Sequence, residues 1–211
     1  MNAYQIEQLE SLQSIRRQLE TMSTATKDAI VGETADYLTF RREVAEFHSR
    51  HFAGVCTEKC YQSRLSACCS RDGIITFFAD MVIHMLVSDS AEIDLMEQAV
   101  RHPEFDFKCI YLTQTGCLWK IKPVVCEFFL CDEAENKVFN TRPEALARWK
   151  DFEESKKRFT WPDRPVLFET LEKFFMDRGC DSPLMYLHKS PGLVSLRKKR
   201  DASQSSSPFI S

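Results

Sequence analysis

Residues 107–131 of the chain read FKCIYLTQTGCLWKIKPVVCEFFLC. This segment contains four cysteines among short aromatic and β-branched runs, which are broken by TQTG at residues 113–116 and by Lys-Pro at residues 122–123. Such runs between turn-forming residues predict short strands and turns, with the cysteines at their ends. We therefore expect an irregular module here and not a long helix.

The segments on both sides of this module have helical patterns. Apolar residues recur at steps of three and four over residues 4–30, and helices are also expected over residues 34–51, 76–87 and 90–103. Beyond the module, helices are expected over residues 143–159 and 165–178, with Gly179 as the stop of the last one. The inward stripe of the first helix should consist of Ile6, Leu9, Leu12, Ile15, Leu19 and Met22.

Composition restricts the class of protein. The 211 residues carry a net charge of -3, which gives no general reason to expect a nucleic-acid partner. The N-terminal residues MNAYQIEQLE lack the features of a secretory signal, and the most apolar stretch, residues 74–87, is shorter than the ~20 apolar residues of a membrane helix. The sequence thus predicts a cytoplasmic protein with no membrane contact.

The cysteines are the unusual feature of the chain. Eight of the nine lie between Cys56 and Cys131, a clustering that in a reducing compartment indicates metal binding or redox chemistry more than disulfides. Thiolate sulfur is a preferred ligand of zinc and of iron–sulfur clusters. The predicted metal ligands are Cys56, Cys60, Cys68, Cys69, Cys109, Cys117, Cys126 and Cys131.

The spacing leaves the kind of site open. Eight cysteines could fill two four-sulfur zinc sites, or one cluster with some left over, and single cysteines are often small buried apolar residues. The ninth, Cys180, is expected to be such a packing residue. His48 and His51 could add a nitrogen ligand, but a place on the helix surface is the simpler interpretation.

Part of the module resembles a known family. The segment CLWKIKPVVCEFFLC at residues 117–131, preceded by CIYL at residues 109–112, is similar to the YkgJ-type cysteine-cluster family, described as a zinc- or iron-chelating domain with a CxxCxxCC signature. Pro123, Cys126, Cys131 and Phe128 or Phe129 stand where the family pattern has Pro, Cys, Cys and Phe. Flagellin lysine N-methylases carry a similar domain, so the resemblance implies metal binding and a role in modifying protein side chains.

These observations together predict a mainly α protein, a helical domain with a small irregular cysteine-rich metal-binding module that contains short strands. The expected parts are N-terminal helices (residues 1–55), the module (56–131), C-terminal helices packed on it (132–189) and a disordered tail (190–211).

The function hypothesis is an iron–sulfur protein, with a [4Fe–4S] cluster favoured, that acts in redox chemistry, sensing or protein modification with a protein substrate or redox partner. The alternative is a structural zinc module for protein–protein contact without catalysis. Thiol–disulfide exchange is disfavoured because the chain has no Cys-x2-Cys pair, and the Cys-x3-Cys-x2-Cys motif of radical S-adenosylmethionine enzymes fails at Ser63. Whether the chain is an enzyme stays open.

Overall fold

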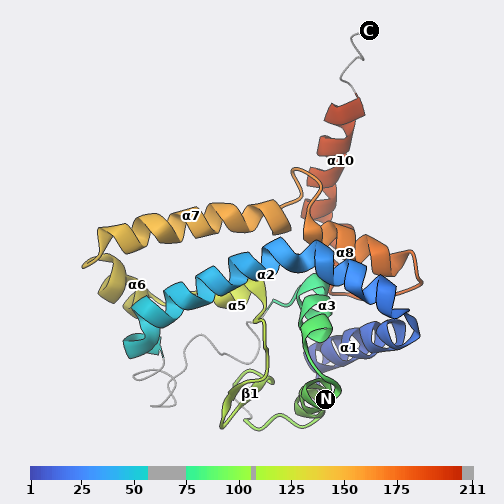
Figure 1. Cartoon of the computed structure of the whole chain (residues 1–211), viewed down its shortest axis with the longest axis horizontal. Helices are drawn as coiled ribbons and strands as arrows, with labels where there is room; N and C mark the ends of the chain where they lie inside the picture. The colour runs from blue at the N-terminus through green and yellow to red at the C-terminus, as the bar shows by residue number, and fades with distance from the viewer. Residues whose placement is uncertain (57–74, 106–107, 206–211) are drawn as a thin grey trace.

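The computed structural model describes residues 1–56, 75–105 and 108–205. Within these ranges the protein is mainly helical, as predicted, and its single sheet is a two-stranded hairpin (Figure 1). The helices and strands, in chain order, are α1 (Ala3–Thr21), α2 (Thr24–Phe52), α3 (Phe78–Val87), α4 (Ser90–Arg101), β1 (Leu112–Thr113), β2 (Gly116–Cys117), α5 (Val124–Glu127), α6 (Asp132–Phe139), α7 (Pro143–Thr160), α8 (Leu167–Met176), α9 (Tyr186–Lys189) and α10 (Pro191–Ser205).

The first two helices differ from the expected boundaries. The predicted helix over residues 4–30 is broken after Thr21, where the Ser23 side chain accepts a hydrogen bond from the Thr26 N–H and begins α2. Serine at this position satisfies an N–H that has no partner inside the helix, which favours a new start over continuation. Ile6, predicted to face the core, is 41% exposed, whereas the stripe from Leu9 to Leu19 is buried.

The centre of the fold is α3, which packs against α1, α2 and α8. Eight of its ten residues are buried, so the helix is apolar almost all round, as a helix with neighbours on several sides must be. Its polar members Asp80 and His84 are buried as well. Burial on this scale makes α3 the main apolar contact between the N-terminal and C-terminal helices.

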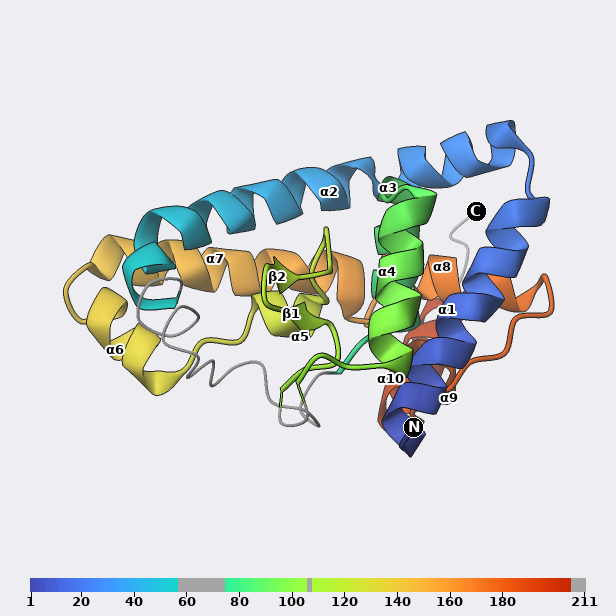
Figure 2. The same cartoon turned by 90° about the horizontal axis from the view of Figure 1, so that it is seen from below.

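An aromatic layer joins α2 to α7. The two helices lie alongside each other in both Figure 1 and Figure 2. Phe47 of α2 stacks on Trp149 of α7 with ring centroids 5.9 Å apart, and Phe128 lies 5.0 Å from the same tryptophan. Because Phe128 directly follows α5, this layer also holds the short helix against α2 and α7.

The hairpin and the end of α8 agree with the predicted elements. Leu112 pairs with Cys117 and Thr113 with Gly116 in an antiparallel register, and Gly116 has a φ of 132°, a conformation that favours glycine. This confirms the predicted short strands. Gly179, with a φ of 83°, follows the end of α8 as predicted.

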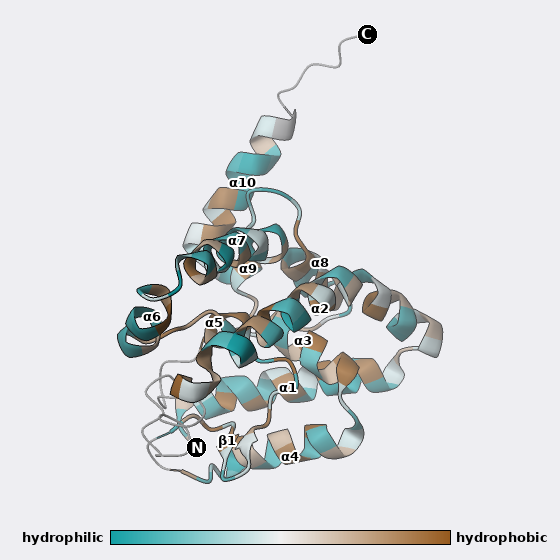
Figure 3. Ribbon diagram, turned by 60° about the vertical axis from the view of Figure 1, so that its left-hand side comes forward, coloured by the Kyte–Doolittle hydropathy of each residue, from teal (hydrophilic) through white to brown (hydrophobic). Residues whose placement is uncertain are grey.

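The tail over residues 190–211 was expected to be disordered, but residues 191–205 form the helix α10. This helix extends away from the other helices (Figure 1). Arg197 and Arg200 bond the Glu169 carboxylate of α8, with the shortest distances 2.7 and 2.6 Å, and fasten the helix to the body. Hydrophilic and hydrophobic segments alternate along α10 and α2 in Figure 3, as in amphipathic helices. No helix within the described ranges is both long and apolar enough to cross a bilayer.

Candidate metal centre

Three of the predicted ligands come together near the hairpin. Cys109 is buried just before β1, Cys117 lies at the end of β2, and Cys126 is half-buried in α5. The antiparallel pairing returns the chain, so that Cys117 stands beside the residue three positions after Cys109. Residues 118–123 then lead into α5, which carries Cys126. Three short segments of sequence thereby bring three thiols to one region.

The electrostatics of these thiols reflects their proximity. Burial raises the pKa of Cys109 to about 12, and the neighbouring Cys117 adds to the increase. Burial is also the largest cause of the raised pKa of Cys126, and Cys109 and Cys117 raise this pKa further. Cys117 is exposed as a residue, yet the protein around its sulfur raises its pKa as well. Burial thus keeps all three thiols protonated, and the neighbouring sulfurs add to this for Cys109 and Cys126. A bound cation would reverse the effect, because metal ligation requires thiolates.

Backbone N–H groups are directed at two of the sulfurs in the same local pattern. The Tyr111 N–H donates to Cys109 Sγ at 3.4 Å. The Trp119 N–H likewise lowers the pKa of Cys117. In both cases the donor is two residues after the cysteine. Hydrogen bonds of this type stabilise negative sulfur and tune metal–thiolate sites.

Two buried hydroxyl groups near the thiols have no hydrogen-bond partner in the described part of the chain. Tyr4 Oη and Thr76 Oγ1 are buried and close to each other but outside hydrogen-bond geometry, and neither has a partner in the described part of the chain. Burial is the largest cause of the raised pKa of Tyr4, and Cys109 and Cys126 contribute to it. Unpaired buried hydroxyls are costly, so an acceptor in this region would be stabilised.

The connection between the hairpin and α5 is held by side chains of the helical frame, one at every second residue. The Lys120 N–H donates to His84 Nδ1 at 3.2 Å, Arg41 Nη2 donates to the Lys122 carbonyl at 2.7 Å, and the Val124 N–H donates to Asp80 Oδ1 at 3.0 Å. We call these three contacts the 120–124 clamp. Because the clamp fixes the chain between Cys117 and Cys126, it sets where the two sulfurs lie relative to each other.

Asp80 accepts a second hydrogen bond besides the one that belongs to the clamp. Its Oδ2 accepts from the Phe77 N–H at 3.2 Å and so caps α3. Burial raises the pKa of Asp80 to about 7, against the opposing effects of Arg41 and the two N–H donors. One carboxylate therefore joins the start of α3 to the start of α5.

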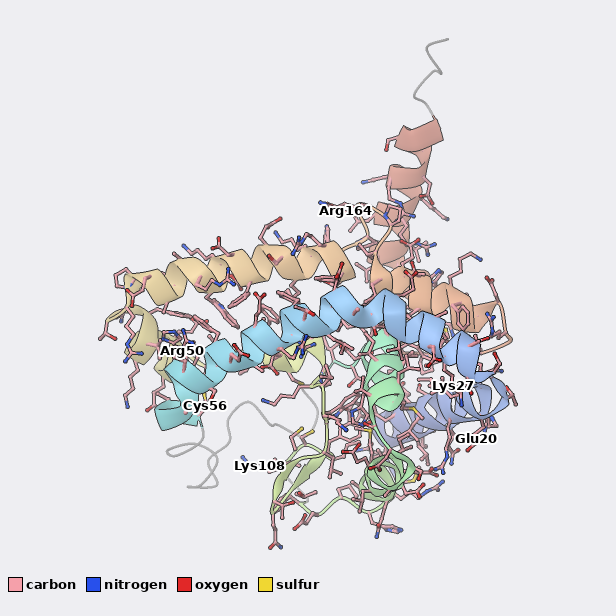
Figure 4. The ribbon with its side chains drawn as sticks, viewed as in Figure 1. Glu20, Lys27, Arg50, Cys56, Lys108 and Arg164 are labelled. Carbon is pink, nitrogen blue, oxygen red and sulfur yellow. The ribbon has the colours of Figure 1, made fainter. Side chains whose placement is uncertain are left out.

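The remaining predicted ligands are placed differently. Cys56, labelled in Figure 4, lies in a π-helical turn that continues α2. Cys131 precedes α6, and both cysteines are half-buried. Cys180 is buried against α1, where Ser14 Oγ donates to its sulfur at 3.3 Å, consistent with the predicted packing role. The predicted ligands Cys60, Cys68 and Cys69 lie outside the described residues.

The histidines considered as ligands face other partners. His48 Nε2 lies 3.9 Å from Glu127 Oε1, and His51 Nδ1 lies 3.2 Å from Arg142 Nη1. His84, buried in α3, accepts the Lys120 N–H, and burial lowers its pKa to about 4.

The candidate ligands are of the right chemical type for thiolate ligation, but too few of them lie together to form a complete site. Within residues 1–56, 75–105 and 108–205, no three His, Cys, Asp or Glu side chains lie close enough together to hold one metal ion. A four-sulfur site at the hairpin would therefore need at least one further sulfur and a closer approach of the three present. Comparisons with protein families, with curated proteins and with solved structures found no match to this chain.

Sequence reasoning missed the polar residues that position this region, above all Arg41, Asp80 and Glu127. A signal for Arg41 was present, because it shares the inward stripe of α2 with Tyr37 and Val44. A charged residue on an apolar stripe has to find a buried partner. The identity of that partner, a carbonyl 81 residues away, could not be read from the pattern.

Proposed function

We propose that this protein binds a metal through cysteine thiolates, with an iron–sulfur cluster, [4Fe–4S] by preference, as the bound group. The observation that carries the proposal is the proximity of Cys109, Cys117 and Cys126, since Cys117 raises the pKa values of both Cys109 and Cys126, and Cys109 raises that of Cys126. The remaining sulfurs would come from the other cysteines of the 56–131 module. When bound, such a cluster supplies one-electron redox chemistry, suited to electron transfer, sensing or protein modification.

Features around the thiols support a ligand role. The N–H groups of Tyr111 and Trp119 directed at sulfur, and the unpaired hydroxyls of Tyr4 and Thr76, would stabilise negative charge on thiolates or inorganic sulfide. The buried rings of Tyr111 and Trp119, 5.1 Å apart, exclude water from one side of the region. Membership of the YkgJ-type family belongs to the same proposal.

A structural zinc site is the second candidate, and the shortness of the local elements favours it. Each strand has two residues and α5 has four, so neither element is stable by itself. A zinc ion held by cysteines from these segments would join them and contribute directly to folding. In that case the module displays its helices for protein–protein contact without catalysis.

The test is to purify the full chain without oxygen and to measure its visible absorption together with iron, acid-labile sulfide and zinc. The expected result is a broad absorption band with iron and sulfide, whereas stoichiometric zinc in a colourless sample would establish the alternative. Cys126→Ser should lose most of the bound metal, and Cys180→Ser, which changes the cysteine packed against α1, should retain it. A wild-type protein with neither metal, or equal metal in both variants, would contradict the proposal.

A further inference from the structure

A pocket of about 330 Å³ lies between α2 and residues 120–127. Its described lining includes Arg41, Ala45, His48, Lys120, Lys122 and Glu127. Cys56, which Figure 4 labels at the end of the segment that continues α2, is also part of the lining. The volume is at the small end of the range for ligand pockets, enough for a compact metabolite.

The charged residues of the pocket leave an excess of positive charge. Glu127, 6% exposed, is 3.6 Å from Arg41 Nη2 and 3.8 Å from Lys122 Nζ, so one carboxylate faces two cations. Lys120 also lines the pocket, but its Nζ is 3.1 Å from Glu92. Among the lining residues, Arg41 and Lys122 face Glu127 alone. Asp80, outside the lining, balances Arg41 only in part because its pKa is raised to about 7, so the pocket favours an anionic occupant.

An unpaired nitrogen atom of Arg41 points to the same kind of occupant. Arg41 is 3% exposed, and its two terminal nitrogens donate to Tyr37 Oη and to the Lys122 carbonyl. Its Nε is buried with no partner in the described ranges. A buried guanidinium N–H without an acceptor costs free energy, and an oxyanion is the acceptor that guanidinium groups bind best.

We propose that this pocket binds a small oxyanion-bearing metabolite, a carboxylate or a phosphate, with an oxygen accepting from Arg41 Nε and its charge facing Lys122. The pocket adjoins the candidate metal centre, because Cys56 is part of its lining and Lys122 lowers the pKa values of Cys117 and Cys126. The proposal does not depend on the identity or presence of a metal. Glu127 keeps the guanidinium oriented while the ligand meets the remaining positive charge.

The experiment is isothermal titration of the full-length protein, as purified with whatever metal it holds, at constant ionic strength. The probes are inorganic phosphate, succinate and the neutral analogue succinamide. Phosphate or succinate should bind and succinamide should not, and the tighter of the two anions identifies the class of headgroup.

Three substitutions test whether the pocket itself binds the anion. Lys122→Gln should weaken binding roughly three- to fivefold, as for a partly exposed charge, while the Lys122 carbonyl that Arg41 uses stays in place. Lys150→Gln, the same change at an exposed position of α7 outside the pocket, should leave binding unchanged. Ala45→Phe should abolish binding by filling the pocket without altering its charge, and Ala35→Phe, on an exposed face of the same helix, is its matched control.

Circular dichroism melts establish that each variant is folded before titration. The proposal is overturned if neither anion binds, if succinamide binds as well as succinate, or if Lys150→Gln weakens binding as much as Lys122→Gln. Binding that survives Ala45→Phe would overturn it too, since the anion would then be held elsewhere.

Discussion

The helical frame around α3 and the cysteine-bearing side of the molecule are stabilised in different ways. In α3, Phe78, Met81 and Ile83 are fully buried, so the frame depends on apolar packing. The hairpin and α5 have few residues and are held by directed contacts, above all the 120–124 clamp. Apolar packing tolerates shifts and similar side chains, whereas hydrogen bonds to named backbone atoms determine a position. The difference suggests that the frame provides stability and the clamp provides geometry for the thiols.

The largest loss of stability is expected when a large buried side chain is removed from the helical frame. Phe78→Ala deletes a ring that is fully buried against Phe175, with centroids 5.5 Å apart, and should lower the free energy of unfolding by about 3–5 kcal/mol. Urea unfolding followed by circular dichroism measures the loss. A change below about 1 kcal/mol would mean that α3 is not the packing centre.

A substitution at Asp80 should affect both regions at once. Asp80→Asn keeps one acceptor oxygen but turns an amide towards one of the two N–H donors, Phe77 or Val124, at a cost of about 1–3 kcal/mol. Bound metal should fall as well, because α5 carries Cys126. The measurements are urea unfolding and metal content on the same samples.

Asp94→Asn is the control for that change, because Asp94 is an exposed carboxylate of α4 that pairs with Arg16. It should cost less than about 1 kcal/mol and leave the metal content unaltered. If Asp80→Asn lowered stability and left the metal content at the wild-type level, the clamp would not position Cys126.

The smallest effect concerns pH and His84. Burial lowers the pKa of His84 from 6.5 to about 4, so the unfolded chain takes up a proton more readily than the folded one as pH falls below 6.5. The histidine therefore contributes stability at pH 7 that is lost on acidification, by about 2 kcal/mol between pH 7 and pH 5. Protonation would also remove the acceptor for the Lys120 N–H.

Asp80 acts in the opposite direction, because its raised pKa favours the folded state as pH falls through 7. The informative quantity is therefore the difference between wild type and His84→Gln, whose carbonyl can still accept the Lys120 N–H. That difference, measured by urea unfolding, should shift by about 2 kcal/mol in favour of the variant from pH 7 to pH 5. A constant difference would show that His84 is not a buried neutral acceptor.

Local patterns predicted a large part of the helical frame and less of the candidate site. The apolar run of α3, the pattern of α4 and α7, and Gly179 after α8 all correspond to elements of the structure. The start of α2 at Ser23 and the helix α10 did not follow from periodicity. The first depends on one hydroxyl, and the second on arginines bonded to Glu169, about 30 residues earlier in the chain.

By itself, the sequence determined that the chain is mainly helical and that eight cysteines fall in one interval with a turn-rich centre, because periodicity and composition are local properties. Only the tertiary structure decided that Cys109, Cys117 and Cys126 lie in one region, and that Arg41, Asp80 and His84 hold the segment between the last two. It also decided that Arg41 and Lys122 share a pocket. The physical reason is that a buried polar group must be paired, but packing across 36 to 81 residues of chain selects its partner.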